Sequence, residues 1–190
     1  MNTITKQTFI DAIRTMFPYL NEQRAKTIIE QIIDINKESI FKRYDIVLPK
    51  IGRITTVVKA PRTGRNPKTG EPYPIPALHA VTATRNNRGI RAGKLLRSNI
   101  INSLVLYGHS TKDATAYVDI WFSTLALVLT GNYRVELRGL GVFYPRTVKA
   151  GDVKRNPATG EPVVIMNDTV HLAFRVAPSL RKAMDKQYLN

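Results

Sequence analysis

The chain has 190 residues, 43% of them hydrophobic, which is enough to bury a core as one domain or as two small ones. Lys and Arg outnumber Asp and Glu by 29 to 14, and the net charge of +15 favours nucleic acid or an anionic membrane as the partner. Cysteine is absent, which excludes disulfides and thiolate metal sites and fits a reducing cytoplasm.

Neither a secretory signal nor a membrane span is expected. Residues 1–9 are polar and lack the apolar core of a signal peptide. The longest apolar run, residues 120–129, contains Ser123 and Thr124 and is far shorter than the roughly 20 apolar residues that cross a bilayer. We therefore interpret this run as a buried helix and expect no membrane partner.

The first half is expected to hold two helices, two short strands, a long protrusion, a third strand and a closing helix. The predicted ranges are 4–17 and 22–41 for the helices, 44–48 and 53–59 for the first strands, 60–76 for the Pro- and Gly-rich protrusion and 80–85 for the third strand. Asn21 can cap the second helix, and Gly52 separates the first two strands.

The second half repeats this order of elements. The predicted ranges are 100–105 for a first helical face, 112–130 for a long helix, 134–137 and 142–148 for two strands, 149–162 for the protrusion, 171–175 for a third strand and a last helix from Pro178. Thr111 can cap the long helix, and Gly131 ends it. Because no Gly- or Ser-rich linker separates the halves, we expect a helical junction near residues 95–101 and halves that pack together.

One motif occurs in both protrusions. Residues 65–72 read Arg-Asn-Pro-Lys-Thr-Gly-Glu-Pro, and residues 155–162, 155 − 65 = 90 positions later, differ from them only by alanine in place of lysine. A repeat of this length indicates one structural unit used twice. Asn-Pro followed by Thr-Gly suits a tight ribbon tip, because proline fixes φ and glycine accepts left-handed geometry.

The chain resembles the HU and integration host factor family, on several segments taken together. These segments are the two motifs above, Gly139-Leu140-Gly141-Val142-Phe143, Ile75-Pro76-Ala77, Gly93-Lys94-Leu95-Leu96-Arg97 and Thr111-Lys112-Asp113-Ala114-Thr115. The resemblance implies an α+β fold of two HU-like units, residues 1–97 and 98–190, packed as an intramolecular pseudo-dimer that is monomeric in solution. Each unit would carry a β-ribbon arm that enters the DNA minor groove, where Pro67 and Pro157 wedge between base pairs.

The implied function is non-enzymatic bending of double-stranded DNA with little sequence preference, in the cytoplasmic nucleoid and without a cofactor. The candidate DNA-binding residues are Lys59, Arg62, Arg65, Asn66, Pro67, Lys68, Arg85, Arg91, Lys94 and Arg97 in the first half, and Arg146, Lys149, Lys154, Arg155, Asn156, Pro157, Arg175 and Arg181 in the second. Arg53 and Lys182 could join the same phosphate-contacting surface. Basic residues exceed acidic ones by 18 to 7 in residues 1–97 and by 11 to 7 in residues 98–190, so the first half should bind a polyanion more strongly.

Two alternatives stay open: a site-preferring bender of the integration host factor type, and a basic packaging protein that binds RNA or an acidic protein. No catalytic motif is found. Residues 89–94 lack the spacing and the Ser or Thr of a phosphate loop. His79, His109 and His171 have no second ligand at metal spacing. Glu30 and Asp34 share a helix face and are interpreted as solvated surface.

Overall fold

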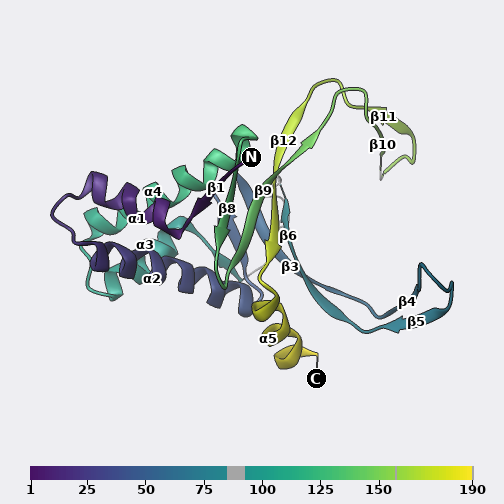
Figure 1. Ribbon diagram of the computed structural model, residues 1–190, viewed down its shortest axis with the longest axis horizontal. Coiled ribbons are helices and arrows are strands. Elements are labelled where there is room, and N and C mark those ends of the chain that lie inside the picture. The colour runs from purple at the N-terminus through teal and green to yellow at the C-terminus, as the bar shows by residue number, and fades with distance from the viewer. Residues whose placement is uncertain (85–92, 157, 190) are drawn as a thin grey trace.

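The computed structural model describes residues 1–84, 93–156 and 158–189 of this mixed α+β protein. Helices α1 to α4 gather at one end of the body, two four-stranded sheets follow, and two ribbons project from the opposite end, while α5 lies apart, beneath the sheets (Figure 1). The helices are α1 (Lys6–Met16), α2 (Glu22–Phe41), α3 (Arg97–Leu106), α4 (Thr111–Ala126) with the 3-10 turn η1 (Leu127–Thr130), and α5 (Pro178–Tyr188).

The two long helices, α2 and α4, begin at capping side chains. Asn21 accepts a hydrogen bond from the Arg24 N–H at 2.8 Å, which confirms it as the cap of α2. Ser110, and not the expected Thr111, caps α4 by accepting from the Asp113 N–H at 3.1 Å. The long helix therefore begins one residue earlier than predicted, and its last turn tightens into η1 before Gly131, whose φ of +80° ends it.

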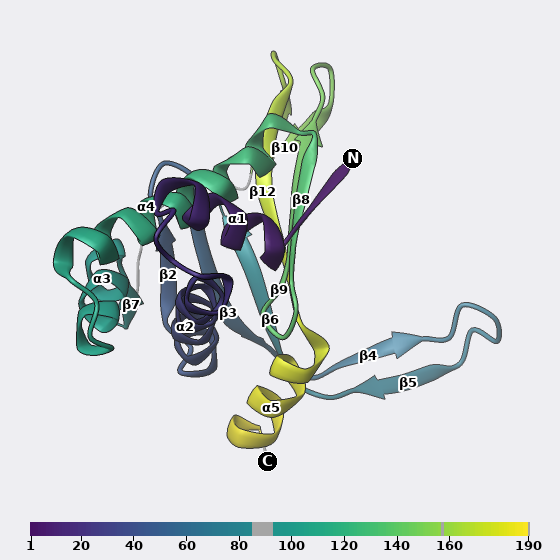
Figure 2. The same cartoon turned by 60° about the vertical axis from the view of Figure 1, so that its left-hand side comes forward.

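Each half contributes three strands to a sheet and two to a ribbon. The strands of the first half are β2 (Asp45–Leu48), β3 (Gly52–Lys59) and β6 (Leu78–Thr84), with β4 (Arg62–Arg65) and β5 (Pro72–Ile75) in the ribbon. Those of the second half are β8 (Tyr133–Leu137), β9 (Gly141–Val148) and β12 (Thr169–Val176), with β10 (Val153–Arg155) and β11 (Pro162–Val164) in the ribbon. The two sheets lie side by side through their edge strands β6 and β12 (Figure 2).

The remaining two strands are exchanged between the halves. β1 (Asn2–Thr5) precedes α1 and runs parallel to β8 of the second half, where Ile4 lies opposite Val135. β7 (Lys94–Leu95) precedes α3 as β1 precedes α1, so we count it with the second half, although the predicted boundary after residue 97 would assign it to the first. It runs parallel to β2 of the first half, where Leu95 lies opposite Ile46. Ile4 and Leu95 are both buried. Each sheet is thus completed by the opposite half.

This exchange overturns two sequence expectations. The helix predicted from residue 4 begins at Lys6, because residues 2–5 form β1. The junction expected to be helical holds the strand β7 instead. The closing helix expected for the first half falls between β6 and α3, where residues 85–92 lie outside the described part of the chain; its counterpart in the second half is α5.

One continuous hydrophobic core runs through both halves. Phe9 on α1 and Trp121 on α4 are fully buried, and their ring centroids lie 5.0 Å apart across the seam. On the same seam, Phe17 stacks edge-on against Tyr117 at 5.0 Å. Trp121 and Phe122 give α4 buried groups on more than one side, as expected of a helix covered by its own half and by the other.

The last helix closes over the first half. Asp185 on α5 accepts a hydrogen bond from the backbone N–H of His79 on β6 at 2.8 Å, and its Oδ1 lies 2.9 Å from His79 Nδ1. The Arg43 guanidinium sits 4.4 Å from the centre of the Tyr188 ring. His79 is therefore a buried structural residue that joins the two halves.

His109, in the turn between α3 and α4, supplies a pH-dependent contribution to stability. Its Nε2 lies 2.9 Å from Gln31 Oε1. Burial lowers the pKa of His109 below its ordinary value of 6.5, and the nearby carboxylate of Asp113 opposes this shift. The His109 imidazole therefore binds a proton less readily in the folded protein than in the unfolded chain. Its contribution to the free energy of unfolding is lost as pH falls below about 6.5.

We expect His109→Gln to remove that contribution. The free energy of unfolding, measured by urea titration at about pH 7.5 and about pH 5, should fall less on acidification in the variant than in the parent protein. His171→Gln, a change at a histidine of β12, serves as the control. An equal acid loss in the parent and the His109 variant would contradict the assignment.

Candidate nucleic-acid interface

The first ribbon, arm 1, is built from β4 and β5 and ends in a tight turn. Arg62 lies opposite Ile75 and Arg65 opposite Pro72. At the tip, the Asn66 N–H donates to the Glu71 carbonyl at 2.9 Å, and the Gly70 N–H donates to the Asn66 carbonyl at 2.8 Å. The Asn66 side chain accepts from the Lys68 N–H at 2.9 Å, an Asx turn that orients the tip.

The second ribbon, arm 2, repeats these three hydrogen bonds at its tip. The Asn156 N–H donates to the Glu161 carbonyl at 2.8 Å, and the Gly160 N–H donates to the Asn156 carbonyl at 2.8 Å. The Asn156 side chain accepts from the Ala158 N–H at 3.0 Å. Gly70 and Gly160 have φ values of +73° and +76°, which explains why glycine stands at both positions. The motif thus encodes one tip geometry used twice.

The two arms differ at their bases. In arm 1, two residues on each strand separate the body sheet from the ribbon, whereas arm 2 has four, residues 149–152 and 165–168. Gly151, with a φ of +85°, donates its N–H to the Ile165 carbonyl at 2.8 Å. The Asp168 carboxylate accepts from the Ala150 N–H at 2.7 Å. These bonds form the turn from which arm 2 leaves the body (Figure 1).

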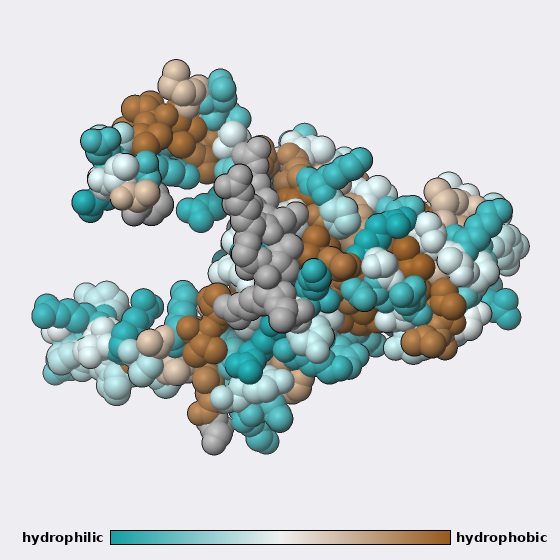
Figure 3. Space-filling view, turned by 180° about the vertical axis from the view of Figure 1, so that it is seen from behind, coloured by the Kyte–Doolittle hydropathy of each residue, from teal (hydrophilic) through white to brown (hydrophobic). Residues whose placement is uncertain are grey.

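Both arms leave the body on the same side and curve around a common open space (Figures 1 and 3). Most of the predicted cations are exposed, on the arms or on the strands that carry them. The exposed candidates are Lys59, Arg62, Arg65, Pro67, Lys68, Lys94, Arg146, Lys149, Lys154, Arg155, Arg175 and Arg181. Arg85, Arg91 and Pro157 lie outside the described residues.

Two predicted phosphate contacts are already engaged with carboxylates. Arg97, at the start of α3, donates from Nε and Nη2 to Asp119 Oδ1 at 3.0 and 2.7 Å. Arg53 Nη1 lies 3.5 Å from Asp45 Oδ2, and its side chain is only 15% exposed. Both arginines therefore hold the body together, and a DNA contact by either one stays a prediction.

Sequence reasoning missed two features of this surface. Arg134 on β8 lies beside Arg175 around a shallow pocket of about 240 Å³, and its Nη2 pairs with Glu136 at 3.1 Å. The second feature is aliphatic: several large apolar side chains of arm 2 are exposed. The run Val163-Val164-Ile165-Met166 could have signalled it, because a two-stranded ribbon has no interior that would bury both of its faces.

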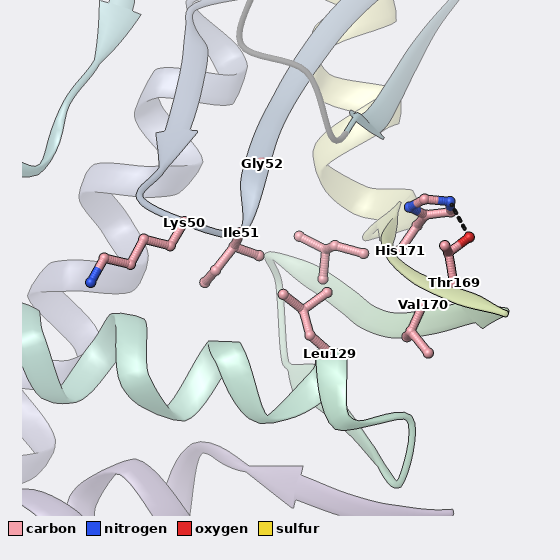
Figure 4. Close-up of a pocket in the computed structure, with 8 residues that line it drawn as sticks. Lys50, Ile51, Gly52, Leu129, Thr169, Val170 and His171 are labelled. Carbon is pink, nitrogen blue, oxygen red and sulfur yellow. Dashed lines mark hydrogen bonds between the residues drawn. The ribbon is translucent and has the colours of Figure 1, made fainter. Parts of the chain in front are cut away.

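A hollow of about 420 Å³ lies at the seam between the halves (Figure 4). The turn before β3 and the start of β12 border it, and Thr169 Oγ1 lies 3.2 Å from His171 Nε2. Its lining residues are Lys50, Ile51, Gly52, Leu129, Thr169, Val170, His171 and Leu172. This lining contains one hydroxyl–imidazole pair, Thr169 and His171, but no carboxylate, so the paired carboxylates of general acid–base catalysis are absent from it.

The two candidate acidic residues on the surface of α2 are engaged in ion pairs. Glu30 pairs with Lys6 at 2.6 Å and Asp34 with Lys37 at 2.9 Å, so both acids take part in surface ion pairs. Among the described residues, His, Asp and Glu form no group of three or more that could hold a metal ion. No described helix has the length and apolarity needed to cross a membrane.

Comparison with known proteins finds relatives for both halves of the chain. A family profile described as "Bacterial DNA-binding protein" matches residues 4–88 and again residues 95–185. Integration host factor subunit alpha of Hydrogenovibrio crunogenus is 32% identical over 99 residues, which cover 52% of this chain and 94% of that subunit. The same subunit of Haemophilus influenzae (strain Rd) is 30% identical over 100 residues, covering 53% of this chain and 96% of the subunit.

Other matches are shorter or more distant. The integration host factor alpha subunit of Albidiferax ferrireducens is 38% identical over 63 residues, 33% of this chain and 62% of the subunit. The chain thus spans about three fifths of that relative's length. A solved structure titled as an Anabaena HU–DNA cocrystal structure aligns with a TM-score of 0.39 and 24% identity, over 50% of this chain and 100% of that one.

The fold and the twin arms define a tandem β-arm protein in which one polypeptide carries two copies of the same unit. The chain belongs to the bacterial DNA-binding protein family, the family of HU and integration host factor, and carries its domain twice.

Proposed function

We propose that this protein binds double-stranded DNA between its two arms and bends it, largely without sequence preference, as a non-enzymatic component of the cytoplasmic nucleoid. One observation carries the proposal: two ribbons with the same tip geometry project from the same side of one body and expose cations along their length (Figure 1). Membership of the bacterial DNA-binding family supports it.

The arm residues suit the minor groove. Negative potential is concentrated in a narrow minor groove and attracts arginine, and Arg62 and Arg65 are exposed along arm 1. Pro67 is exposed at the tip, where an apolar ring can enter between base pairs and kink the duplex. Since Pro157 occupies the equivalent motif position, we assign it the same role on arm 2.

The single chain takes the place of a dimer. Because β1 and β7 are exchanged, each half lacks one strand of its own sheet and depends on the other half for it. We therefore propose that the protein is a monomer in solution. The division into residues 1–97 and 98–190 stays a prediction, and the family match leaves residues 89–94 between its two copies.

Replacing both Pro67 and Pro157 with alanine should straighten the bound DNA. Without the two wedges, the bend angle should decrease more than the affinity does, because the phosphate contacts remain. The angle is measured by fluorescence energy transfer between dyes at the two ends of a duplex of about 35 base pairs. The control is Pro74→Ala, on β5 of arm 1. An unchanged bend angle in the double variant would show that Pro67 and Pro157 are not wedges.

Competition separates this function from RNA or protein packaging. Duplex RNA has a wide, shallow minor groove and should compete poorly against DNA of the same length and charge. The readout is displacement of a labelled DNA duplex by unlabelled RNA or by an acidic protein such as polyglutamate. Displacement at equal charge by either competitor would rule out minor-groove binding.

A further inference from the structure

A hollow of about 520 Å³ lies at the helical end of the body, opposite the end from which the arms project (Figure 1). The first half contributes the turn between α1 and α2 and the start of α2, and the second half contributes the turn between α3 and α4 and the start of α4. This volume suits a small molecule. The lining residues that could contact a ligand are Tyr19, Arg24, Tyr107, His109, Asp113 and Tyr117.

Equivalent positions of the two halves line this hollow with different side chains. Helices α2 and α4 begin 111 − 22 = 89 positions apart, and the same offset relates Arg24 to Asp113 and Ile28 to Tyr117. All four residues belong to the lining. A dimer of two identical chains would carry the same side chain at both equivalent positions. The tandem chain instead carries a cation and a carboxylate, and an aliphatic group and a phenol.

The two charged groups of the hollow are available to a ligand. Among the described residues, neither the Arg24 guanidinium nor the Asp113 carboxylate forms an ion pair. Their backbone N–H groups bond to the helix caps, at 2.8 Å to Asn21 and at 3.1 Å to Ser110. The local structure therefore holds the backbone at both positions and leaves the charged ends of the side chains without a partner.

Tyr117 places a hydroxyl at the base of the hollow. The residue is only 3% exposed, and its ring packs edge-on against His109 at 5.6 Å. Burial, together with the negative charge of Asp113, raises the pKa of Tyr117 to about 12, so the hydroxyl keeps its proton at neutral pH. No hydrogen bond joins this hydroxyl to the described part of the chain, and such a buried group is costly without one. A polar ligand in the hollow would supply the bond.

Aromatic rings provide much of the remaining surface. Tyr19 and Tyr107 line the hollow from the two turns, one from each half, and are 71% and 56% exposed. The faces of tyrosine and histidine are surfaces on which nucleobases stack. A planar base is therefore a suitable ligand for this part of the hollow.

The charged groups indicate which base it is. A carboxylate only accepts hydrogen bonds, and guanine presents two neighbouring N–H donors on one edge. The same edge of adenine or cytosine combines its amine with a ring nitrogen that accepts, which disfavours a carboxylate. A guanidinium matches a phosphate. Asp113 and Arg24 therefore suit the two ends of a guanine nucleotide.

We propose that the hollow binds a guanine nucleotide, either free or as an unpaired residue of a single strand. The base stacks on the tyrosines of the two turns and donates from its guanine edge to Asp113. The Tyr117 hydroxyl donates to the keto oxygen of the base, and Arg24 binds the phosphate. The site lies apart from the arms, so this proposal goes beyond DNA bending and does not depend on it.

Calorimetric titration of the full chain with guanosine monophosphate and adenosine monophosphate tests the site. We expect one guanosine monophosphate per chain, bound about tenfold more tightly than the adenine nucleotide. Asp113→Asn keeps one carbonyl acceptor and should reduce that preference to below about twofold. The matched control is Asp11→Asn on α1, where the carboxylate accepts from Gln7 at 2.9 Å outside the hollow. Absence of binding, equal affinity for both nucleotides, or an equal loss in the control would overturn the site.

Two further variants assign the remaining contacts. Arg24→Gln should weaken guanosine monophosphate about tenfold and leave guanosine, which lacks the phosphate, unchanged. Tyr117→Phe removes only the hydroxyl and should weaken both ligands about fivefold. An equal loss of both ligands in Arg24→Gln, or no loss in Tyr117→Phe, would contradict the proposed arrangement.

Competition separates this site from the arms. Guanosine monophosphate should bind equally well to the free protein and to its complex with a duplex of about 35 base pairs. Displacement of the nucleotide by the duplex would place it on the arms and overturn the site, whereas failure of the duplex to bind would contradict DNA bending alone. A thymine strand of about eight nucleotides with one central guanine identifies the source. Binding of this strand that Asp113→Asn weakens assigns an unpaired guanine, and binding that the variant leaves unchanged assigns the free nucleotide.

Discussion

Binding to a duplex of about 35 base pairs should weaken by about 10³–10⁵-fold between 50 and 200 mM salt, if about 6–10 phosphates are neutralised. The physical reason is counterion release: each cation that contacts a phosphate frees a condensed ion, and added salt opposes that release. Dissociation constants measured by fluorescence anisotropy across this range give the slope. A flat response would contradict the electrostatic account.

Arm 1 should supply a large share of the slope of the logarithm of the binding constant against the logarithm of the salt concentration. Replacing Arg62, Arg65 and Lys68 with alanine removes three exposed cations and should decrease the magnitude of the slope by about 2.7, close to 0.9 for each lost phosphate contact. The control variant replaces Lys26 and Lys37 of α2 together with its C-cap Lys42, away from the arms (Figure 1). Equal changes in the two triple variants would mean that the arm has no special role.

Trp121→Ala should cost about 3–5 kcal/mol of the free energy of unfolding, a large part of the stability of a domain of this size. The Trp121 side chain is fully buried and packs at 5.0 Å against Phe9 of the other half. Removing it leaves a cavity at the seam, and both halves should lose stability together. The change is measured by urea denaturation followed by circular dichroism, because Trp121 is the only tryptophan.

Tyr107→Ala is the matched aromatic control, since Tyr107 is 56% exposed and its loss should change stability by about 0.5 kcal/mol or less. A single transition is expected in the parent and in both variants, since the core is continuous. Two separate transitions, one for each half, would contradict a shared seam.

Elements that depend on local chemistry were predictable from the sequence. The span 22–41 with its cap Asn21 was predicted as observed, because apolar spacing and a capping side chain both mark α2. The repeated motif predicted both tips, since proline and glycine fix a turn within a few residues. Pro178 was correctly placed at the start of α5, where a missing N–H costs nothing.

Features that depend on partners distant in the chain were not predictable. β1 is four residues long and has no local signal that distinguishes a strand from the first turn of a helix, and its partner β8 lies about 130 residues away. His79 and Asp185 are separated by 106 residues, and Arg97 and Asp119 by 22. Composition did indicate unequal arms, but the exposure of the large apolar side chains of arm 2 required the structure.

Light scattering, on the free protein and on its complex with one short duplex, tests most directly whether a single chain is the complete DNA-bending unit. The account predicts a mass near 21.4 kDa for the free protein and one chain on each duplex of about 35 base pairs. Two chains in the free protein, or two on each duplex, would contradict it, because each half would then be seeking its mate in another molecule.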